Sequence, residues 1–154
     1  MTDQDKVNSL FELADVLSHQ RDYDEILRLI TQKVLALFNS ETASIVLVNP
    51  NTQHTVKTIV RDGGSINKQQ QQLLQTNIVG WVNKNRKSFL SANIQADDRF
   101  RKGLFQNCDV QSAMSASLVF QSVMIGFIVL LDNRNNQFKI NDVALFEKFA
   151  LICA

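Results

Sequence analysis

The chain has 154 residues, of which 45% are hydrophobic and 20% are charged, and these proportions are typical of one folded globular domain. Its formal net charge of +1, with Lys and Arg scattered along the chain, argues against a nucleic-acid-binding surface. The longest apolar run, residues 123–131, has about half of the ~20 residues that a membrane span requires, so we expect no membrane segment.

Residues 1–39 are expected to form two helices. Five apolar residues of the first helix recur at the spacing of one helical face: Val7, Leu10, Phe11, Ala14 and Leu17. The second helix has an acidic start, with Asp22 and Glu25 spaced as in a capping box, and Asn39 is a favourable residue for its end. Its apolar stripe consists of Ile26, Leu27, Ile30, Val34, Leu37 and Phe38.

Two strands are predicted next, at the start of a region of sheet and pocket that we place at residues 42–132. Residues 44–48 form a continuous run rich in β-branched side chains, which is typical of a strand covered on both faces. Asn49, Pro50 and Asn51 favour a turn, and the alternating residues 54–60 favour a strand with one wetter face. We therefore expect a hairpin.

The middle of the chain has weaker patterns. The polar stretch NKQQQQLLQT, residues 67–76, is expected to be a loop or a short exposed helix. Residues 78–86 predict a short helix, and residues 88–90 predict a brief strand. The segment SANIQADDRFRKG predicts a loop, with a helix that begins near its end and runs toward Cys108.

The last third of the chain predicts a second hairpin and a helix. Residues 111–120 and 123–131 are strand-forming runs, and Gln121 and Ser122 between them favour a tight turn. The last helix is expected to start near Asn141 and to occupy residues 141–154. Strands that cluster into hairpins, with helices at both ends of the chain, predict an antiparallel sheet with helices on its faces, in the α+β class.

The two ends of the sequence carry further information. The last nine residues, FEKFALICA, lie inside an apolar helical pattern with no capping residue, so we expect a fragment whose last helix continues. This helix has more apolar residues than one buried face requires, and we expect the surplus to contact a second copy. These residues are Val143, Leu145, Phe146, Phe149, Ala150 and Ile152. The polar N-terminus and the distant Cys108 and Cys153 predict a cytoplasmic chain with free thiols.

Four segments, in this order and spacing, resemble the GAF domain, a ligand-sensing relative of the PAS fold. They are NIVGWVNKNRKSFL, NIQADDRF, SASLVFQSVMIGFIVLLDN and QFKINDVALFEKFA, and the similarity covers about the whole chain, so residues 1–154 are expected to be a single GAF domain. The resemblance implies an antiparallel sheet of about six strands with a ligand pocket on one face. It also implies terminal helices that join a dimer and transmit a signal.

The turn before the last helix raises the question of cyclic-nucleotide binding. Nucleotide-binding GAF domains carry an Asn, a basic residue, a Phe and an Asp-Glu pair, and Asn133, Arg134, Phe138 and Asp142 match this signature, with Val143 in place of the Glu. In the signature a basic side chain pairs with the carboxylate. Alternatively, these residues form a structural corner, in which Phe138 fills the core and Asp142 caps the last helix. We favour the structural corner, and a cyclic nucleotide is the alternative.

Two kinds of cysteine chemistry occur in GAF domains. The cysteine that attaches a bilin falls near Phe100 in this chain, which has no thiol there, so no covalent bilin is expected. Free methionine-R-sulfoxide reductases have a nucleophilic Cys before an Asp, as in Cys108-Asp109, but they also need a resolving thiol, and the segment IVGWV has none. We therefore expect Cys108 to be buried and inert and the domain to have no catalytic residue.

Candidate ligand contacts follow from the resemblance. Arg99 lies in a loop that borders the family's pocket and is the candidate partner for an anionic ligand group. By the period of two in a strand, we expect three serines to share one face and supply hydroxyls: Ser112, Ser115 and Ser117. Trp81, Phe100 and Phe105 are aromatic candidates for the pocket wall or the core. His19 and His54 have no metal-ligand spacing, and we expect no metal site.

The sequence thus predicts a regulatory domain that binds an unidentified small molecule and forms a homodimer through its terminal helices. The parent is expected to be a bacterial signalling protein, such as a histidine kinase or response regulator of a two-component system, a cyclase or phosphatase, or a transcription factor. Two alternatives stay open, a thiol enzyme centred on Cys108 and a ligand-free dimerisation module.

Overall fold

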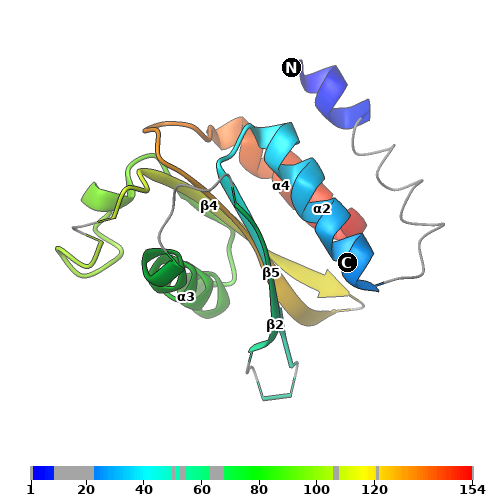
Figure 1. The fold of residues 1–154 in the computed structure, drawn as a ribbon, viewed down its shortest axis with the longest axis horizontal. Coiled ribbons are helices and arrows are strands. Elements are labelled where there is room, and N and C mark those ends of the chain that lie inside the picture. The colour runs from blue at the N-terminus through cyan, green and yellow to red at the C-terminus, as the bar shows by residue number, and fades with distance from the viewer. Residues whose placement is uncertain are drawn as a thin grey trace.

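A computed structural model describes residues 2–8, 23–49, 51–52, 55–62, 68–105, 108–120 and 122–153. A five-stranded sheet separates two helical layers, as Figure 1 shows. Helix α3 (Lys68–Asn85) covers one face, and α2 (Tyr23–Phe38) and α4 (Ile140–Cys153) cover the other. The predicted α+β class is confirmed, but within these ranges the sheet has five strands instead of about six. None of the helices in these ranges is long and apolar enough to cross a membrane.

All neighbouring strands are antiparallel, and their order across the sheet is β2-β1-β5-β4-β3. The strands are β1 (Thr42–Val48), β2 (Thr55–Asp62), β3 (Phe89–Ser91), β4 (Ser112–Phe120) and β5 (Val123–Asp132). Six of the seven residues of β1 are buried, so the strand is covered on both faces, as its continuous β-branched run predicts. The last strand, β5, is the central strand of the sheet and pairs with both β1 and β4.

Alternate residues of the central strands enter two separate cores. The core on the α2/α4 side contains Ile45, Met114 and Ile128 from the sheet, together with Val34 and Phe146 from the two helices. The core on the α3 side contains strand residues of the other parity and the inward stripe of α3. Its principal members are Val46, Phe127, Val129, Leu131, Leu74, Ile78 and Val82. The two cores therefore share the same strands, back to back.

Gly126 allows β5 to lie close to β1. A Cβ atom at this position would stand 2.4 Å from the carbonyl oxygen of Val46. That atom belongs to the backbone of a paired strand, so it cannot move without disturbing the β1–β5 ladder. A glycine is therefore required here for close packing.

One prediction for the middle of the chain is wrong. The polar stretch 67–76 is neither a loop nor a short helix, because residues 68–85 form the single 18-residue helix α3. Leu74, Ile78 and Val82 recur every four residues and are buried against the sheet. Many glutamines obscure this stripe in the sequence, and one of them, Gln71, is itself buried one turn before Leu74.

The segment between β3 and β4 also differs from the prediction. Residues 97–105 form turns and not the expected helix, and the only helical piece in the described part of this segment is the short 3-10 helix η1 (Ile94–Ala96). The side chain of Asn93 accepts a hydrogen bond from the backbone N–H of Gln95, which caps η1. The Gln95 amide in turn donates to the carbonyl oxygens of Cys108 and Val110. These side-chain bonds replace the backbone bonds of a helix.

The terminal helices pack mainly on their own domain. Asn39 has a φ of 50°, the left-handed conformation that ends α2 as predicted. Of the six apolar residues expected on α4, the five as far as Ala150 are buried or partly buried against the α2/α4-side core, and contact of this helix with a second copy stays a prediction. The side chain of Ile152 lies outside the described part of the structure, as do Leu10, Phe11, Ala14, Leu17, His19, Asp22 and His54.

Candidate functional site

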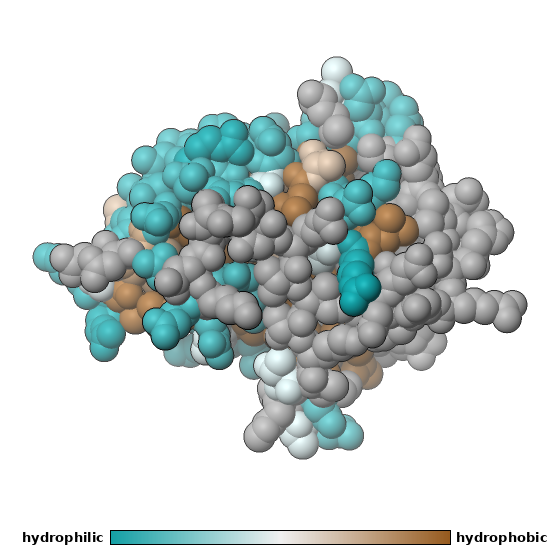
Figure 2. Space-filling model, in the orientation of Figure 1, coloured by the Kyte–Doolittle hydropathy of each residue, from teal (hydrophilic) through white to brown (hydrophobic). Residues whose placement is uncertain are grey.

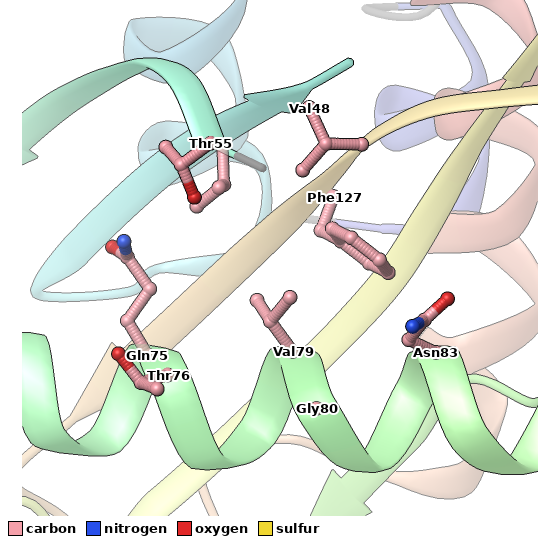
Figure 3. Close-up of a pocket in the computed structure, with 9 residues that line it drawn as sticks. Val48, Thr55, Gln75, Thr76, Val79, Gly80, Asn83 and Phe127 are labelled. Atoms are coloured by element: carbon pink, nitrogen blue, oxygen red, sulfur yellow. The ribbon is translucent and has the colours of Figure 1, made fainter. Parts of the chain in front are cut away.

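A pocket of about 210 Å³ lies between α3 and the sheet. We call it the α3 pocket, and Figure 3 shows its walls. It is lined by Val46, Val48, Thr55, Gln75, Thr76, Val79, Gly80, Asn83 and Phe127. Val79 points from α3 toward the sheet, and Phe127 points back from β5 toward the helix. The pocket is therefore framed by a helix and by strands β1, β2 and β5, all of which are regular elements with fixed positions.

Among the described residues, the polar side chains that line the α3 pocket are uncharged. Gln75 and Thr76 lie at one end, near Thr55, and Asn83 lies at the other end beside Phe127. The side-chain oxygen of Asn83 is buried and has no hydrogen-bond partner among the described residues. Gly80 leaves the helix surface open between the two ends, because a Cβ atom there would meet no atom within 4 Å. The pocket thus offers an apolar body with a polar group at each end.

The predicted aromatic residues gather in a row outside this pocket. The ring centroids of Trp81 and Phe89 are 5.5 Å apart, those of Phe89 and Phe100 are 5.6 Å apart, and those of Phe100 and Phe105 are 5.3 Å apart. Phe89 and Phe105 are buried, and Trp81 and Phe100 pack against the α3-side core. The structure therefore brings Trp81, Phe100 and Phe105 together, but as an aromatic seam that holds the β3–β4 segment against α3.

The guanidinium of Arg99 binds to groups of its own chain. Its guanidinium contacts both carboxylate oxygens of Asp97, donates to the carbonyl oxygen of Leu90, and lies 4.1 Å from the ring centroid of Phe89. Although burial raises the pKa of Asp97, hydrogen bonds from Arg99 and Ser91 hold that pKa below its usual value. The positive charge predicted to meet an anionic ligand is therefore compensated by Asp97.

A second hollow, of about 420 Å³, lies along the β3–β4 segment. Phe100 and Phe105 line it together with Arg101 and Lys102. On the face that Figure 2 shows, this end of the molecule is mainly hydrophilic with a small hydrophobic area. The described residues that line it belong to η1 and the turns that follow it, so the hollow lacks the frame of long helix and strands that surrounds the α3 pocket.

The three serines of β4 do not share a face, which corrects the prediction. Ser115 and Ser117 differ from Ser112 by an odd number of residues, so the pleat places Ser112 on the opposite side. The Ser115 hydroxyl donates to the carbonyl oxygen of Ile128, and the Ser112 hydroxyl donates to the carbonyl oxygen of Arg134. Ser117 lines a shallow hollow with Ala150 of α4 and neighbouring residues. None of the three lines the α3 pocket.

The corner after β5 is built around Asp132 instead of Asp142. The buried carboxylate of Asp132 accepts hydrogen bonds from Nε of Arg134 at 2.9 Å and from Nη2 at 3.0 Å. It also accepts from the backbone N–H groups of Arg134 and Glu41. Nη2 of Arg134 further donates to the carbonyl oxygen of Asn39, where α2 ends. This Asp132 clamp joins the end of β5 to α2 and to the start of β1.

Asp142 has other partners, so the ion pair expected from the nucleotide signature is not the one that forms. Its carboxylate lies 3.1 Å from Nζ of Lys6 and accepts a hydrogen bond from the backbone N–H of Lys139, just before α4. Lys6 also lies over the ring of Phe38. Phe138 is 2% exposed and belongs to the α2/α4-side core, whereas Asn133 is exposed. Arg134 and Asp142 of the signature therefore serve two separate contacts, Phe138 fills a core position, and Asn133 is exposed.

Cys108 is buried, and its environment suppresses thiolate formation. Burial raises the pKa of the Cys108 thiol, the hydrogen bond with the Val110 backbone opposes this in part, and the carboxylate of Asp109 adds a smaller increase. The side chain of Cys153 lies outside the described part of the structure. Within that part, no three His, Cys, Asp or Glu side chains come close enough to hold a metal ion.

None of the nine residues that line the α3 pocket was identified from the sequence. They are Val, Thr, Gln, Gly, Asn and Phe, which are ordinary constituents of strands and helices. One signal was available: Gly80 interrupts a helical pattern at an exposed position, and a glycine there needs a packing or functional reason.

Comparison with known proteins identifies the family. Residues 20–154 match the sequence profile of the GAF domain, so the chain belongs to the GAF domain family. No curated protein sequence matches this chain. The resemblance seen in the sequence is thereby confirmed.

Several solved structures have the same fold. The GAF domain of a phosphoenolpyruvate-protein phosphotransferase from Acinetobacter is 12% identical, with a TM-score of 0.70, over 99% of this chain and 92% of that chain. Free methionine-R-sulfoxide reductase from Neisseria meningitidis, in complex with its substrate, is 13% identical, with a TM-score of 0.73, over 99% of this chain and 89% of that chain. The photoproduct state of GAF3 from Slr1393 of Synechocystis is 12% identical, with a TM-score of 0.63, over 86% of this chain and 90% of that chain. Such low identities show the fold alone.

Proposed function

We propose that this chain is a regulatory sensor domain that binds a small molecule in the α3 pocket and performs no chemistry itself. One observation carries the proposal: a pocket of about 210 Å³ with apolar walls and convergent polar groups lies between regular elements. Membership of the GAF family supports it. A fully packed core on the α3 side would instead have favoured a ligand-free dimerisation module.

The proposed route of transmission runs through the shared strands. Val46 and Phe127 line the pocket from β1 and β5, and Ile45 and Ile128, their neighbours on the same strands, pack under the α2/α4 layer. A ligand that shifts these strands biases the terminal helices between two arrangements. We propose that these helices form a homodimer in a cytoplasmic bacterial signalling protein and pass this bias to its output domain.

The absence of chemistry is proposed from the state of Cys108. Sulfoxide reduction needs a thiolate that reaches its substrate, whereas burial and the adjacent Asp109 raise the pKa of this thiol. Cys108 lies in the α3-side core and does not line the α3 pocket. These contacts support a packing role for the thiol.

Native mass spectrometry of the protein purified from its own source tests the ligand-binding proposal. We expect a bound compound of fixed mass in the wild type and its loss in Gly80→Leu, since Gly80 lines the pocket and a Cβ added there meets no protein atom within 4 Å, so the added side chain takes up free space. Lys84→Leu is the matched control, because Lys84 is exposed on the same helix and does not line the pocket.

A compound retained equally by wild type and Gly80→Leu would place the ligand elsewhere. If nothing co-purifies and no compound of a broad metabolite library raises the melting temperature, the ligand-free dimerisation module becomes the better explanation.

A further inference from the structure

We propose that the N-terminal helical segment, residues 3–8, is a charge-held latch that ties the end of α2 to the start of α4. Its contact is made by Lys6, whose ammonium group lies 3.1 Å from Oδ1 of Asp142 and 5.7 Å from the ring centroid of Phe38. Asp142 belongs to the first turn of α4, and Phe38 is the last residue of α2. The segment, marked N in Figure 1, lies beside this end of the α2/α4 layer. One side chain therefore bridges two helices.

Lys6 makes the polar contacts that join the described part of this segment to the two helices. Among residues 2–8, Lys6 and Val7 are half-buried, and the other side chains are exposed. Val7 belongs to neither of the two cores of the domain. The side-chain oxygens of Thr2 and Asp5 each accept a hydrogen bond from the backbone N–H of the other residue, so these bonds support the segment itself and not its docking. We infer that docking depends on the charge of Lys6.

The carboxylate of Asp142 holds the latch and supports α4 at the same time. Its Oδ1 faces Lys6, and its Oδ2 accepts a hydrogen bond from the backbone N–H of Lys139 at 2.9 Å. The side chains of Lys6 and Asp142 are each 17% exposed, and the ring of Phe38 adds attraction for the ammonium group. An ion pair that is partly open to water shifts an equilibrium by about two- to tenfold, so docking of the segment is readily reversed.

Release of the segment changes how the start of the last helix is held. With Lys6 docked, the first turn of α4 is tied to the last turn of α2 through one ammonium group. With Lys6 released, Asp142 keeps its bond to Lys139, and α4 stays attached through buried side chains such as Phe146, whose ring centroid lies 5.4 Å from that of Phe38. In the sensor proposed above α4 is an output helix, so the latch sets how firmly its start is held, and this last step alone rests on the proposed function.

Backbone order parameters from 15N relaxation of the full chain test the latch. In the wild type at low salt we expect values of about 0.85 in residues 5–8, as in rigid backbone. In Lys6→Gln, which keeps a flexible polar side chain but removes the charge, we expect values below about 0.6. Lys6→Arg keeps the charge and should keep the wild-type values. Lys148→Gln is the matched control, because Lys148 is exposed on α4, and it should leave residues 5–8 unchanged.

A second variant tests the partner of Lys6. Asp142→Asn removes the charge but keeps an oxygen that accepts the Lys139 N–H. We expect it to release residues 5–8 as far as Lys6→Gln does, and the double variant to release them no further, because both changes remove the same pair. Raising the salt concentration from 0.1 M to 1 M shortens the Debye length from about 10 Å to about 3 Å, so it should lower the wild-type order parameters toward those of Lys6→Gln.

The outcomes that overturn the proposal are specific. Wild-type order parameters already below about 0.6 in residues 5–8 mean that the segment is not docked. Unchanged order in Lys6→Gln means that other contacts hold the segment. A double variant that loses more order than either single variant means that Lys6 and Asp142 act independently. None of these results bears on the α3 pocket, which the co-purification experiment tests separately.

Discussion

Replacement of Asp132 by alanine tests what holds the corner between the sheet and the helices. Its carboxylate is fully buried and receives four hydrogen bonds, two from the Arg134 side chain and two from backbone N–H groups of Arg134 and Glu41. Asp132→Ala removes the acceptor from all of them at once. We expect the folded state to survive but to lose a large part of its stability.

The magnitude follows from what is left behind. The side chain of Arg134 is 53% exposed, and in the variant its guanidinium hydrogen-bonds to water instead, so the lost ion pair with Asp132 contributes little to the loss of stability. The backbone N–H groups of Arg134 and Glu41 lose a charged acceptor at a partly buried site, and each loss lowers the free energy of unfolding by about 1–2 kcal/mol. The total is about 3 kcal/mol, which corresponds to a fall in melting temperature of about 6–12 °C for a domain of this size.

Thermal unfolding measured by circular dichroism gives the result directly. Asp98→Ala is the control, because Asp98 is an exposed aspartate and its loss should change the melting temperature by no more than about 1–2 °C. Asp132→Asn keeps the shape of the side chain but removes its charge, so its melting temperature should lie between those of Asp132→Ala and Asp98→Ala. If Asp132→Ala and Asp98→Ala melt together, the clamp does not hold the corner and the reasoning from buried hydrogen bonds is refuted.

Four further outcomes are expected. Asp142→Ala should lower the free energy of unfolding by about 1 kcal/mol in a thermal melt, since its carboxylate supports the start of α4. If cyclic AMP or GMP strongly raises the melting temperature of the wild type and not of this variant, the nucleotide signature is supported instead. The pKa of Asp97 is lower in the folded state than in the unfolded state, so its ionised carboxylate stabilises the fold fully above the ordinary aspartate pKa. This stabilisation is lost as the pH falls through the lowered, folded-state pKa. The difference in free energy of unfolding between the wild type and Asp97→Asn should therefore shrink over that acidic range. Methionine sulfoxide turnover with a thiol reductant should stay at background, and turnover abolished by Cys108→Ser would contradict this. Light scattering at micromolar concentration should report a dimer that deletion of residues 1–18 weakens, whereas a monomer at all concentrations would remove the proposed route to the output domain.

The sheet was predictable because its strands carry their own signal. The β-branched run of β1 and the apolar run of β5 are buried on both faces or nearly so, and such strands read as continuous hydrophobic stretches. The left-handed residue Asn39 at the end of α2 was predictable for a local reason as well, since asparagine tolerates positive φ.

The helix α3 was missed because its burial is narrow. Among its described side chains only Gln71, Leu74, Ile78 and Val82 are fully buried, and many of the other positions hold glutamine, asparagine or threonine, which resemble a loop in composition. The β3–β4 segment was predicted as a loop with a helix near its end, and only the loop was right. The hydrogen bonds of Asn93 and Gln95 to nearby backbone groups favour turns.

The site was the least predictable part, and the reason is physical. Charged and aromatic residues attract attention in a sequence, yet in this fold Arg99 and Arg134 each pair with an aspartate two positions away and stabilise turns. The α3 pocket exists because Gly80 and neutral side chains leave space between a helix and a sheet, and space has no sequence signature of its own. Since β1 and β5 contribute to this pocket on one face and pack against α2 and α4 on the other, the proposed ligand would contact the same strands that support α2 and α4.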